Sequence, residues 1–548
     1  MGREILEFIN PATGERFGQV AMATEDEARC AVQDLRAAAP GWARRPVVER
    51  VRVLRELQSV LIAARDEISA TITQDTGKSR QDALIEVFVT VDMLNDACRH
   101  AHQWLRRERV SRGLYVFKSC HVEPRPFGVV AIISPWNYPL ALSVPPVVAA
   151  LLAGNTVALK PSEVTAATGV LVESLLRRVP ELRPLVRVLH GDGSVGAALV
   201  SAPPDYIFLT GSTPTGRKVM RAAAEHLTPI TCELGGKDAM LVLADADVAA
   251  AARWGAWGAF FNAGQTCMAV ERVYVHSAVY DDFVQQAVAE TEALKVGYSL
   301  ETEALNQVGP LTFPKQMEIV ERHVADAVAQ GARILTGGQR RGAFYEPTVL
   351  VDVTHAMLLM REETFGPLMP IMRVADDAEA VSLANDSAFG LSASVWSRDR
   401  EHAAGVARQL QTGSVIINDT IAQFGVPQLP FGGVKQSGFG RTHGKAGLRQ
   451  FTQPFAYAAG GPPPAVDLAT VLRQPGHYRL GSAILRLAFG VGPRQRLAPV
   501  VEALEPVVEA IERKSRSADL KWLGLGLGAA GLAAAVVLAV APRRRRGR

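Results

Sequence analysis

The spacing of apolar residues changes along the chain, and each change marks a predicted element. Residues 25–39 and 47–70 carry apolar side chains at helical spacing, so they are predicted as two helices, the first ending at Pro40. Between residues 115 and 133 the pattern becomes that of strands. Prolines interrupt its middle part, 121–126, which predicts an edge strand or an arm and excludes a central strand.

Three apolar strands further along end in turns that carry polar residues or glycine. Strand 128–133 leads to Trp136 and Asn137, strand 156–159 to Lys160 and Glu163, and strand 205–210 to Gly211 and Ser212. Strands that alternate with helices predict an α/β fold with a doubly wound parallel sheet, in which ligands bind outside the carboxyl ends. By pattern alone, Asn137 could merely cap a turn, whereas an exposed ion pair is favoured for Lys160 and Glu163, and an ordinary β–α turn for Gly211 and Ser212. A glycine turn that opens a helix also suits a pyrophosphate.

Composition limits the classes of protein that the chain can belong to. At 548 residues, with 48% hydrophobic and 21% charged residues, it should hold more than one domain. A net charge of +4 gives no reason to expect nucleic acid as a partner. Five cysteines without a CxxC pair, and no N-terminal signal pattern, indicate a cytoplasmic body with neither a disulfide framework nor a metal site. Lys78 follows a glycine turn and could meet a phosphate, but we expect it at the surface.

The candidate chemistry lies in two glycine-containing turns that hold Glu233 and Cys267. A thiolate is a strong nucleophile, and a carboxylate within reach can take a proton from the thiol or from an attacking water. Most lone cysteines are small buried hydrophobic residues, and we interpret the other four, Cys30, Cys98, Cys120 and Cys232, in that way.

The segments Glu-Leu-Gly-Gly-Lys at 233–237 and Gly-Gln-Thr-Cys at 264–267 resemble the two active-site signatures of the NAD(P)-dependent aldehyde dehydrogenases. Their active residues, 34 positions apart, also suit that family. The resemblance covers roughly residues 8–455. It implies two Rossmann-like doubly wound domains and a β arm for oligomerisation, hence a homodimer or homotetramer.

The resemblance also implies the roles of individual residues. Cys267 would attack the aldehyde, Asn137 and the backbone N–H of Cys267 would hold the oxyanion, and Glu233 would activate the water that hydrolyses the thioester. The implied cofactor contacts are Trp136, Lys160, Glu163, Gly211, Ser212, Glu363 and Phe365. Because a carboxylate at Glu163 repels a 2′-phosphate, we expect NAD, with NADP possible.

Aromatic residues give an indication of the substrate. Trp257 and Phe261 precede the nucleophile turn, and Phe431 lies in a later segment that also resembles the family. Core packing is an equally simple account of the aromatic run. Relatives that oxidise succinate semialdehyde carry an arginine at the position of Phe261, so an apolar aldehyde is expected. A succinate-semialdehyde-type enzyme and a catalytically idle membrane scaffold are the alternatives.

The C-terminal part departs from soluble members of the family. Residues 522–541 carry no charge and are long enough to span a membrane, and four arginines follow. A buried core helix is the other interpretation. A single span would place these arginines outside, against the positive-inside tendency, so a hairpin with the apolar segment 478–491 is an alternative. This organisation resembles the fatty aldehyde dehydrogenases, which implies a membrane-associated enzyme.

These observations predict five regions. They are an NAD-binding domain (1–114 and 128–233), an oligomerisation arm (115–127 and 445–458), a catalytic domain (234–444), a linker with amphipathic helices (459–519) and a transmembrane anchor with a basic tail (520–548).

Overall fold

The computed structural model describes residues 3–113 and 118–460, together with separate positions between 478 and 502. The chain divides into two compact units, one formed by Met1–Arg109 and His121–Tyr457 and the other by Val110–Cys120 and Ala458–Arg548. The first unit contains both large β-sheets and all the predicted catalytic and cofactor residues.

The chain begins with the antiparallel hairpin β1 (Ile5–Ile9) and β2 (Arg16–Ala21), followed by α1 (Glu25–Ala43). Helix α1 continues past the predicted stop, because Pro40 lies in its last turn and its carbonyl still accepts a hydrogen bond from the Arg44 N–H. The single helix predicted over 47–70 is also wrong. A break at Ala64 separates α2 (Val47–Ala63) from α3 (Arg65–Thr76), and the apolar spacing runs on across it.

A six-stranded sheet has the order β21-β9-β8-β5-β6-β7. Its strands are β5 (Val129–Ile133), β6 (Thr156–Lys160), β7 (Val186–Val188), β8 (Tyr206–Thr210), β9 (Ile230–Glu233) and β21 (Gly438–Phe439). All pairs are parallel except β21 with β9. The strand order reverses between β5 and β8, so this is a doubly wound sheet with its switch point at these two strands, as predicted.

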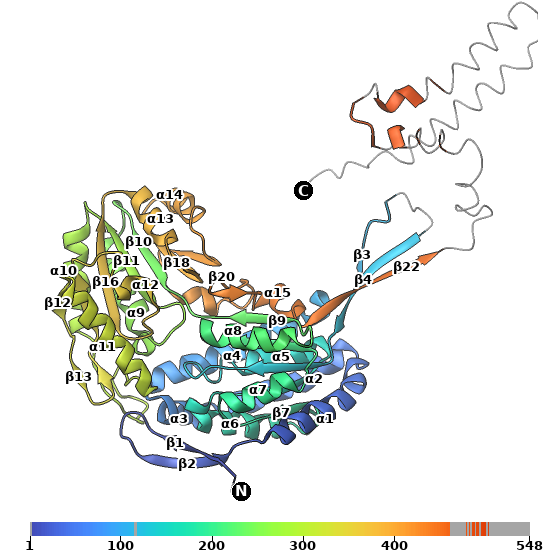
Figure 1. Cartoon of the computed structure of the whole chain (residues 1–548), viewed down its shortest axis with the longest axis horizontal. Helices are drawn as coiled ribbons and strands as arrows, with labels where there is room; N and C mark the ends of the chain where they lie inside the picture. Colours follow the sequence, from blue (N-terminus) through green and yellow to red (C-terminus); the bar gives the residue numbers. More distant parts are fainter. Residues whose placement is uncertain are drawn as a thin grey trace, which may run out of the picture. The chain divides into compact units, whose positions relative to one another are not determined.

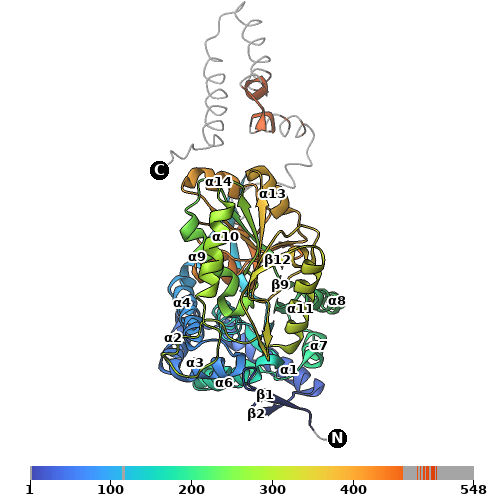
Figure 2. The same cartoon turned by 90° about the vertical axis from the view of Figure 1, so that its left-hand side faces the viewer.

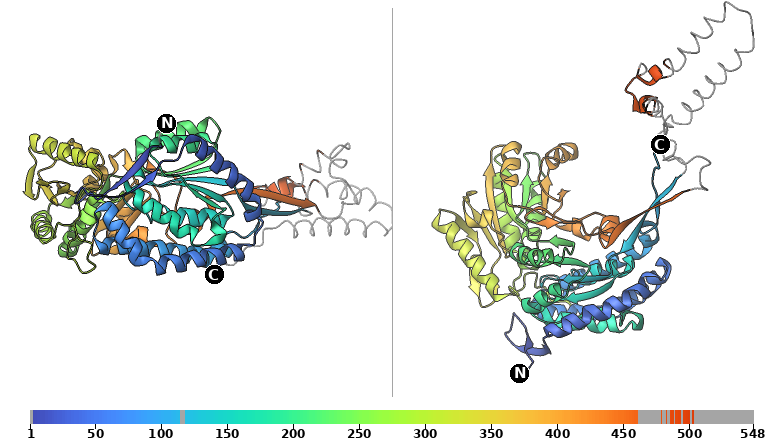
Figure 3. Two further views of the ribbon diagram at one scale, coloured as in Figure 1. Left: turned by 90° about the horizontal axis from the view of Figure 1, so that it is seen from below. Right: turned by 45° about the vertical axis from the view of Figure 1, so that its right-hand side comes forward.

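Helices cover both faces of this sheet (Figures 1 and 3). Val130 and Ile132 of β5 face a core shared with α2, α3, α4 (Arg80–Trp104), α5 (Val144–Ala153) and α6 (Ala166–Arg177). Val129 and Ala131 face the opposite core, with α1, α7 (Gly193–Ser201) and α8 (Thr213–Ala224). Since successive strand residues point to opposite faces, a strand buried on both faces is apolar throughout, which explains the continuous run in the sequence.

The second sheet has seven strands in the order β12-β15-β16-β11-β10-β18-β19. They are β10 (Asp238–Val242), β11 (Val270–His276), β12 (Arg333–Thr336), β15 (Thr348–Val351), β16 (Leu368–Val374), β18 (Ser392–Trp396) and β19 (Ser414–Ile417). Helices α9 (Val248–Phe260) and α10 (Tyr280–Glu292) lie on one side and α11 (Pro314–Ala329) on the other (Figure 2). The remaining helices are α12 (Leu358–Arg361), α13 (Asp377–Asn385), α14 (Arg400–Ala407) and α15 (Gly444–Arg449). Short strand pairs are β13 (Arg340–Arg341) with β14 (Phe344–Tyr345), and β17 (Phe389–Gly390) with β20 (Val434–Lys435).

A three-stranded sheet contains the proline-bearing segment, in the order β22-β4-β3. Its strands are β3 (Glu108–Arg109), β4 (Lys118–Pro126) and β22 (Thr452–Gly460). The exclusion of a central strand is therefore wrong, since β4 is the middle strand. It tolerates Pro124 and Pro126 because β3 is only two residues long and pairs with β4 at His121 and Val122.

The predicted membrane segment 522–541 lies outside the described residues, and 478–491 is described only in part. None of the described helices is both long and apolar enough to cross a membrane.

Candidate active site

One cavity of about 720 Å³ brings the predicted site residues together. Its walls include Trp136, Asn137, Lys160, Glu163, Gly211, Ser212, Glu233, Cys267, Glu363, Phe365 and Phe431. Trp257 and Phe261 do not line the cavity but pack against the cluster of apolar residues that contains Phe431 and contacts Cys267.

The two large sheets contribute residues to this cavity from opposite ends of their strands. Asn137 follows the carboxyl end of β5, and Glu233 ends β9. Cys267 precedes the amino end of β11, and Glu363 precedes that of β16. The first sheet thus contributes the carboxyl ends at its switch point, where open α/β sheets bind ligands. The second sheet contributes its amino ends, which explains why its site residues come before the strands.

A strained turn presents Cys267. Three successive residues, Asn262, Ala263 and Gly264, have left-handed backbone angles, with φ of 53°, 55° and 72°. Left-handed Ala263 is unfavourable, and such strain persists only where the surroundings impose it. Burial, together with the carboxyls of Asp238, Glu363 and Glu233, raises the pKa of the Cys267 thiol well above its usual range. The thiol is therefore protonated at neutral pH and needs a base to become a nucleophile.

Glu233 is a buried base. Its residue is 6% exposed, and neither carboxyl oxygen has a hydrogen-bond partner among the residues that the structure describes. Burial raises its pKa well above the usual value, against the opposing effect of the Arg441 charge. A desolvated carboxylate is more basic than one in water, so Glu233 is suited to removing a proton from a thiol or a water.

Asn137 is buried beside the nucleophile turn. Its Nδ2 atom donates a hydrogen bond of 3.1 Å to the Gln265 carbonyl. A side-chain amide has two N–H donors, so one remains for an oxygen in the cavity. The arrangement places an amide donor and a thiol on the same cavity wall.

The cavity residues at the ends of β6 and β8 include the polar groups that a dinucleotide needs. The Lys160 ammonium lies 2.8 Å from the Glu163 carboxylate, and only the carboxylate is substantially exposed. Ser212 caps α8, and the added Cβ at Gly211 would meet only Leu209, at 3.9 Å. A carboxylate suits ribose hydroxyls, and an open glycine turn at a helix start suits a pyrophosphate. These residues therefore fit a nicotinamide dinucleotide.

Glu363 reaches the turn that follows Glu233. It accepts a hydrogen bond of 3.0 Å from the Gly236 N–H, and a Cβ at Gly235 would come within 2.3 Å of its carboxyl oxygens. Only glycine at 235 permits this approach. Burial, with the charge of Glu271 as a second cause, raises the pKa of Glu363 to about 8.

Aromatic rings surround the thiol on the other side. The ring of Phe261 lies 5.0 Å from Trp257 and 6.4 Å from Tyr138, centroid to centroid. Phe424 and His443 pack against Phe431. Burial lowers the pKa of His443 to about 4, so this imidazole is neutral at physiological pH.

The chain matches the family model described as the aldehyde dehydrogenase family over residues 2–455. It belongs to this family. The enzyme is an NAD(P)-dependent aldehyde dehydrogenase, and its predicted α/β fold is confirmed.

Two curated relatives show the range of substrate names among similar enzymes. The 4,4'-diapolycopene aldehyde oxidase of Methylomonas sp is 44% identical over 451 residues, which cover 82% of this chain and 84% of that protein. A protein of Mycolicibacterium smegmatis described as an NADP(+) succinate-semialdehyde dehydrogenase is 37% identical, covering 80% of this chain and 86% of its own.

Solved structures agree with the fold. Lactaldehyde dehydrogenase from Escherichia coli has a TM-score of 0.80 and 32% identity, covering 84% of this chain and 96% of its own. NADP-dependent glyceraldehyde-3-phosphate dehydrogenase from Bacillus halodurans, complexed with NADP, has a TM-score of 0.79 and 34% identity, covering 83% and 96%.

Some charged residues that support the residues lining the cavity were not predicted from the sequence. Glu271 accepts hydrogen bonds of 2.8 Å from the N–H groups of Thr364 and Phe365, and its carboxylate lies 2.5 Å from the Lys237 ammonium. This carboxylate holds the segment after Glu363 although it does not line the cavity. The sequence signal was a charged residue inside the apolar strand β11.

Two predictions about surface and core residues were also wrong. Lys78 was expected at the surface but is buried, where the Glu86 carboxylate 3.0 Å away compensates its charge. Cys30, expected to be a buried hydrophobic residue, is exposed on α1.

Proposed function

We propose that this enzyme oxidises medium- or long-chain, or aromatic, apolar aldehydes to carboxylic acids with NAD. The proposal rests on the residues that line the cavity. Among the described lining residues the only cations are Lys160 and Lys218, which lie on β6 and α8 at the dinucleotide side. Apart from Asn137 and Glu233, the residues beside the thiol are rings and aliphatic groups such as Phe424, Phe431 and Leu391, so an aldehyde that carries an anionic group would lose its hydration without gaining a cationic partner.

Three helices, α4, α5 and α15, also line the cavity, and the charged residue that they contribute is Asp96 on α4. The apolar lining there consists of Met93, Ala97 and Trp104 on α4, Pro145, Pro146 and Ala149 on α5, and Leu448 on α15. Each methylene group buried there contributes about 0.8 kcal/mol, so affinity should rise with the length of the aldehyde.

In the proposed mechanism, Glu233 takes the proton of the Cys267 thiol, directly or through a water, and the thiolate adds to the aldehyde carbon. Asn137 donates its free N–H to the oxyanion. NAD, when bound, supplies the hydride acceptor. Glu233 must first release the thiol proton to solvent, so that it is ionised again. It then removes a proton from the water that hydrolyses the thioester on Cys267 and returns a proton to the departing thiolate, which releases the acid and regenerates the thiol.

The preference for NAD over NADP rests on Glu163. Its carboxylate pairs with Lys160 and remains partly exposed at the dinucleotide side. A 2′-phosphate near this carboxylate would be repelled, while ribose hydroxyls would donate to it.

A succinate-semialdehyde-type activity is the second candidate, because a relative 37% identical bears that name. Phe261 opposes it: its ring stands where such relatives carry an arginine and packs against the cluster that contains Phe431, so this position offers no cation to the carboxylate of succinate semialdehyde. A long apolar aldehyde agrees better with the name of the 44% identical relative.

Membrane association and oligomerisation are part of the same proposal. The uncharged segment 522–541 is long enough to span a bilayer and would hold the enzyme where apolar aldehydes partition. An inactive scaffold would not need a thiol, a base and an amide donor on one cavity wall. We propose the β22-β4-β3 sheet as the dimerisation arm.

A substrate series tests the substrate class. We expect kcat/KM for unbranched aldehydes to rise about three- to fourfold per added methylene group until the cavity is filled, since about 0.8 kcal/mol corresponds to that factor. Succinate semialdehyde should rank below hexanal. NAD reduction by the full-length protein in isolated membranes is the measurement, with Cys267→Ala membranes as the blank. Preferred turnover of succinate semialdehyde would contradict the proposal.

The affinity for NAD should increase with pH near 8. Glu363 is protonated below its pKa of about 8, and only the ionised form accepts hydrogen bonds with both oxygens from ribose hydroxyls. The Kd for NAD should therefore fall as pH rises from about 7 to about 9. Quenching of intrinsic fluorescence measures the Kd. Glu363→Gln should bind NAD more weakly and without this pH dependence; an unchanged pH profile in the variant would contradict the assignment.

A further inference from the structure

A buried ion pair lies directly behind the cavity wall that carries Asn137. Lys78, between α3 and α4, and Glu86, on α4, lie with ammonium and carboxylate 3.0 Å apart, and their side chains are 1% and 0% exposed. Neither residue lines the cavity. Two charges taken out of water cost several kcal/mol each, and their attraction often fails to offset that cost, so fold stability alone is a weak reason for this pair.

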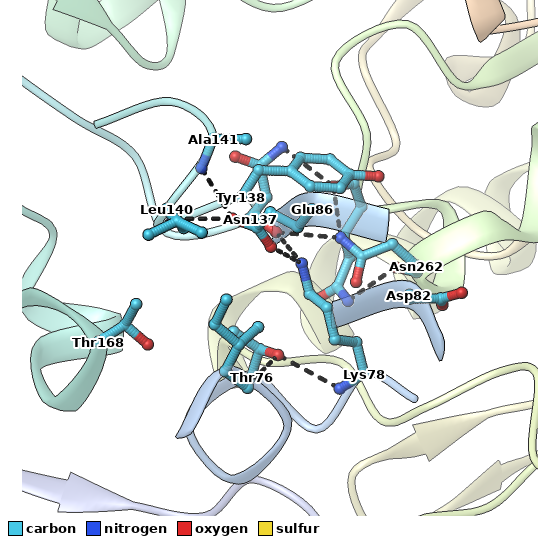
Figure 4. A network of polar contacts seen from close by, with 12 residues as sticks. Thr76, Lys78, Asp82, Glu86, Asn137, Tyr138, Leu140, Ala141, Thr168 and Asn262 are labelled. Atoms are coloured by element: carbon cyan, nitrogen blue, oxygen red, sulfur yellow. Dashed lines mark hydrogen bonds and ion pairs between the residues drawn. The ribbon is translucent and has the colours of Figure 1, made fainter. Parts of the chain in front are cut away.

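Both charged groups form hydrogen bonds with the loop between β5 and α5. Lys78 Nζ donates a hydrogen bond of 2.7 Å to the main-chain carbonyl of Asn137. Glu86 Oε1 accepts hydrogen bonds of 2.7 and 3.1 Å from the N–H groups of Leu140 and Ala141 (Figure 4). One ion pair therefore holds the loop at both ends of the segment that begins with the proposed oxyanion donor.

The same carbonyl ties this loop to the nucleophile turn. Asn262 Nδ2 donates to the Asn137 carbonyl and to the Gln265 carbonyl, each over 3.2 Å. With Lys78 as the other donor, both lone pairs of the Asn137 carbonyl are occupied, which fixes the peptide plane after Asn137. The ammonium of Lys78 also lies 4.3 Å from the centroid of the Tyr138 ring, a cation–π contact.

We propose that Lys78, neutralised by Glu86, is a positioning residue for Asn137, an inference that rests on the proposed function. The Lys78 ammonium orients the Asn137 backbone, and through it the side-chain N–H that points to the developing oxyanion. A misdirected donor still permits substrate and cofactor to bind, but it stabilises the transition state less.

The test variant is Lys78→Met combined with Glu86→Gln, assayed in the full chain. It removes both charges of the pair together, so neither Lys78 nor Glu86 stays buried as a charge without the other, and the amide oxygen introduced by Glu86→Gln remains an acceptor for the Leu140 and Ala141 N–H groups. We expect kcat to fall about 10- to 100-fold, less than the roughly 10²- to 10³-fold loss typical when an oxyanion donor is removed. The Kd for NAD and the rate of Cys267 alkylation by iodoacetamide should each change less than about threefold, because Lys78 contacts neither group.

Combination with Asn137→Ala decides whether Lys78 acts through Asn137. If it does, adding Lys78→Met and Glu86→Gln to Asn137→Ala lowers kcat by less than about threefold further. An undiminished loss in that background, or a parallel loss of NAD affinity and thiol alkylation, would overturn the inference. Asn137→Ala alone tests the proposed function: full activity in that variant refutes the oxyanion role of Asn137 and the inference with it.

Two further variants separate positioning from folding. Asp75→Asn is the matched control, because Asp75 is a buried carboxyl on α3 that accepts hydrogen bonds from Thr168 and does not line the cavity. It should lower the unfolding temperature and leave kcat within about twofold. If the methionine variant does not fold, Lys78→Gln with Glu86→Gln keeps the site polar but is one bond too short to reach the Asn137 carbonyl. The same loss of kcat is expected from it, and wild-type kcat would overturn the inference.

Discussion

Cys267→Ala is expected to abolish aldehyde oxidation, with kcat reduced by at least about 10³-fold, because removal of a covalent nucleophile eliminates the acyl-enzyme route entirely. The thiol lies in a strained turn on the cavity wall, and none of the other described cysteines lines this cavity. NADH formation at saturating aldehyde and NAD measures the effect.

Cys98→Ala is the matched control for Cys267→Ala. Cys98 is a buried cysteine on α4, outside the cavity lining, and burial raises its pKa to about 11. Its replacement should cost some stability through a small cavity and leave the rate nearly unchanged. Substantial residual oxidation by Cys267→Ala, with NAD affinity intact, would show that a different group carries the reaction.

Glu233→Gln is expected to lower steady-state turnover by about 10²- to 10⁴-fold, the usual contribution of a general base. The amide cannot accept a proton from the attacking water, so the thioester on Cys267 should accumulate. The gain in mass of the acylated protein, measured by mass spectrometry after mixing with aldehyde and NAD, reports it. Because the proposed mechanism also uses Glu233 to deprotonate the thiol, the first turnover should slow as well, and the thioester accumulates to the extent that hydrolysis slows more than acylation.

The pH profile of the wild type provides a second measurement on Glu233. Its pKa is raised by burial, so the ionised base becomes available only as pH rises above the normal carboxyl range, and turnover should increase with pH there. Glu173→Gln is the control, because Glu173 is a carboxylate on α6 that is hydrogen-bonded to His190 and does not line the cavity. An unaltered rate in Glu233→Gln would contradict the assigned base.

The motifs that resemble the family predicted residues that the structure brings together. The residues predicted for catalysis and cofactor contact all line one cavity, because they occupy short turns at strand ends, whose composition depends on local geometry. The doubly wound sheets followed from apolar runs between helices. The ends of the helices were predicted less accurately than their existence. The break at Ala64 and the turn that contains Pro40 leave the apolar spacing of α1, α2 and α3 unchanged, so the sequence pattern does not reveal them.

The sequence by itself determined the family and the α/β class, and it predicted the reacting groups. Only the tertiary structure decided which distant charges support them. Lys78 meets the Asn137 carbonyl across 59 residues, and Glu271 meets the Phe365 N–H across 94. In a linear pattern Lys78 is expected at the surface, since a charge is buried only where partners offset its lost hydration. Those partners come from other elements, and their distances are set by the packing of the whole fold.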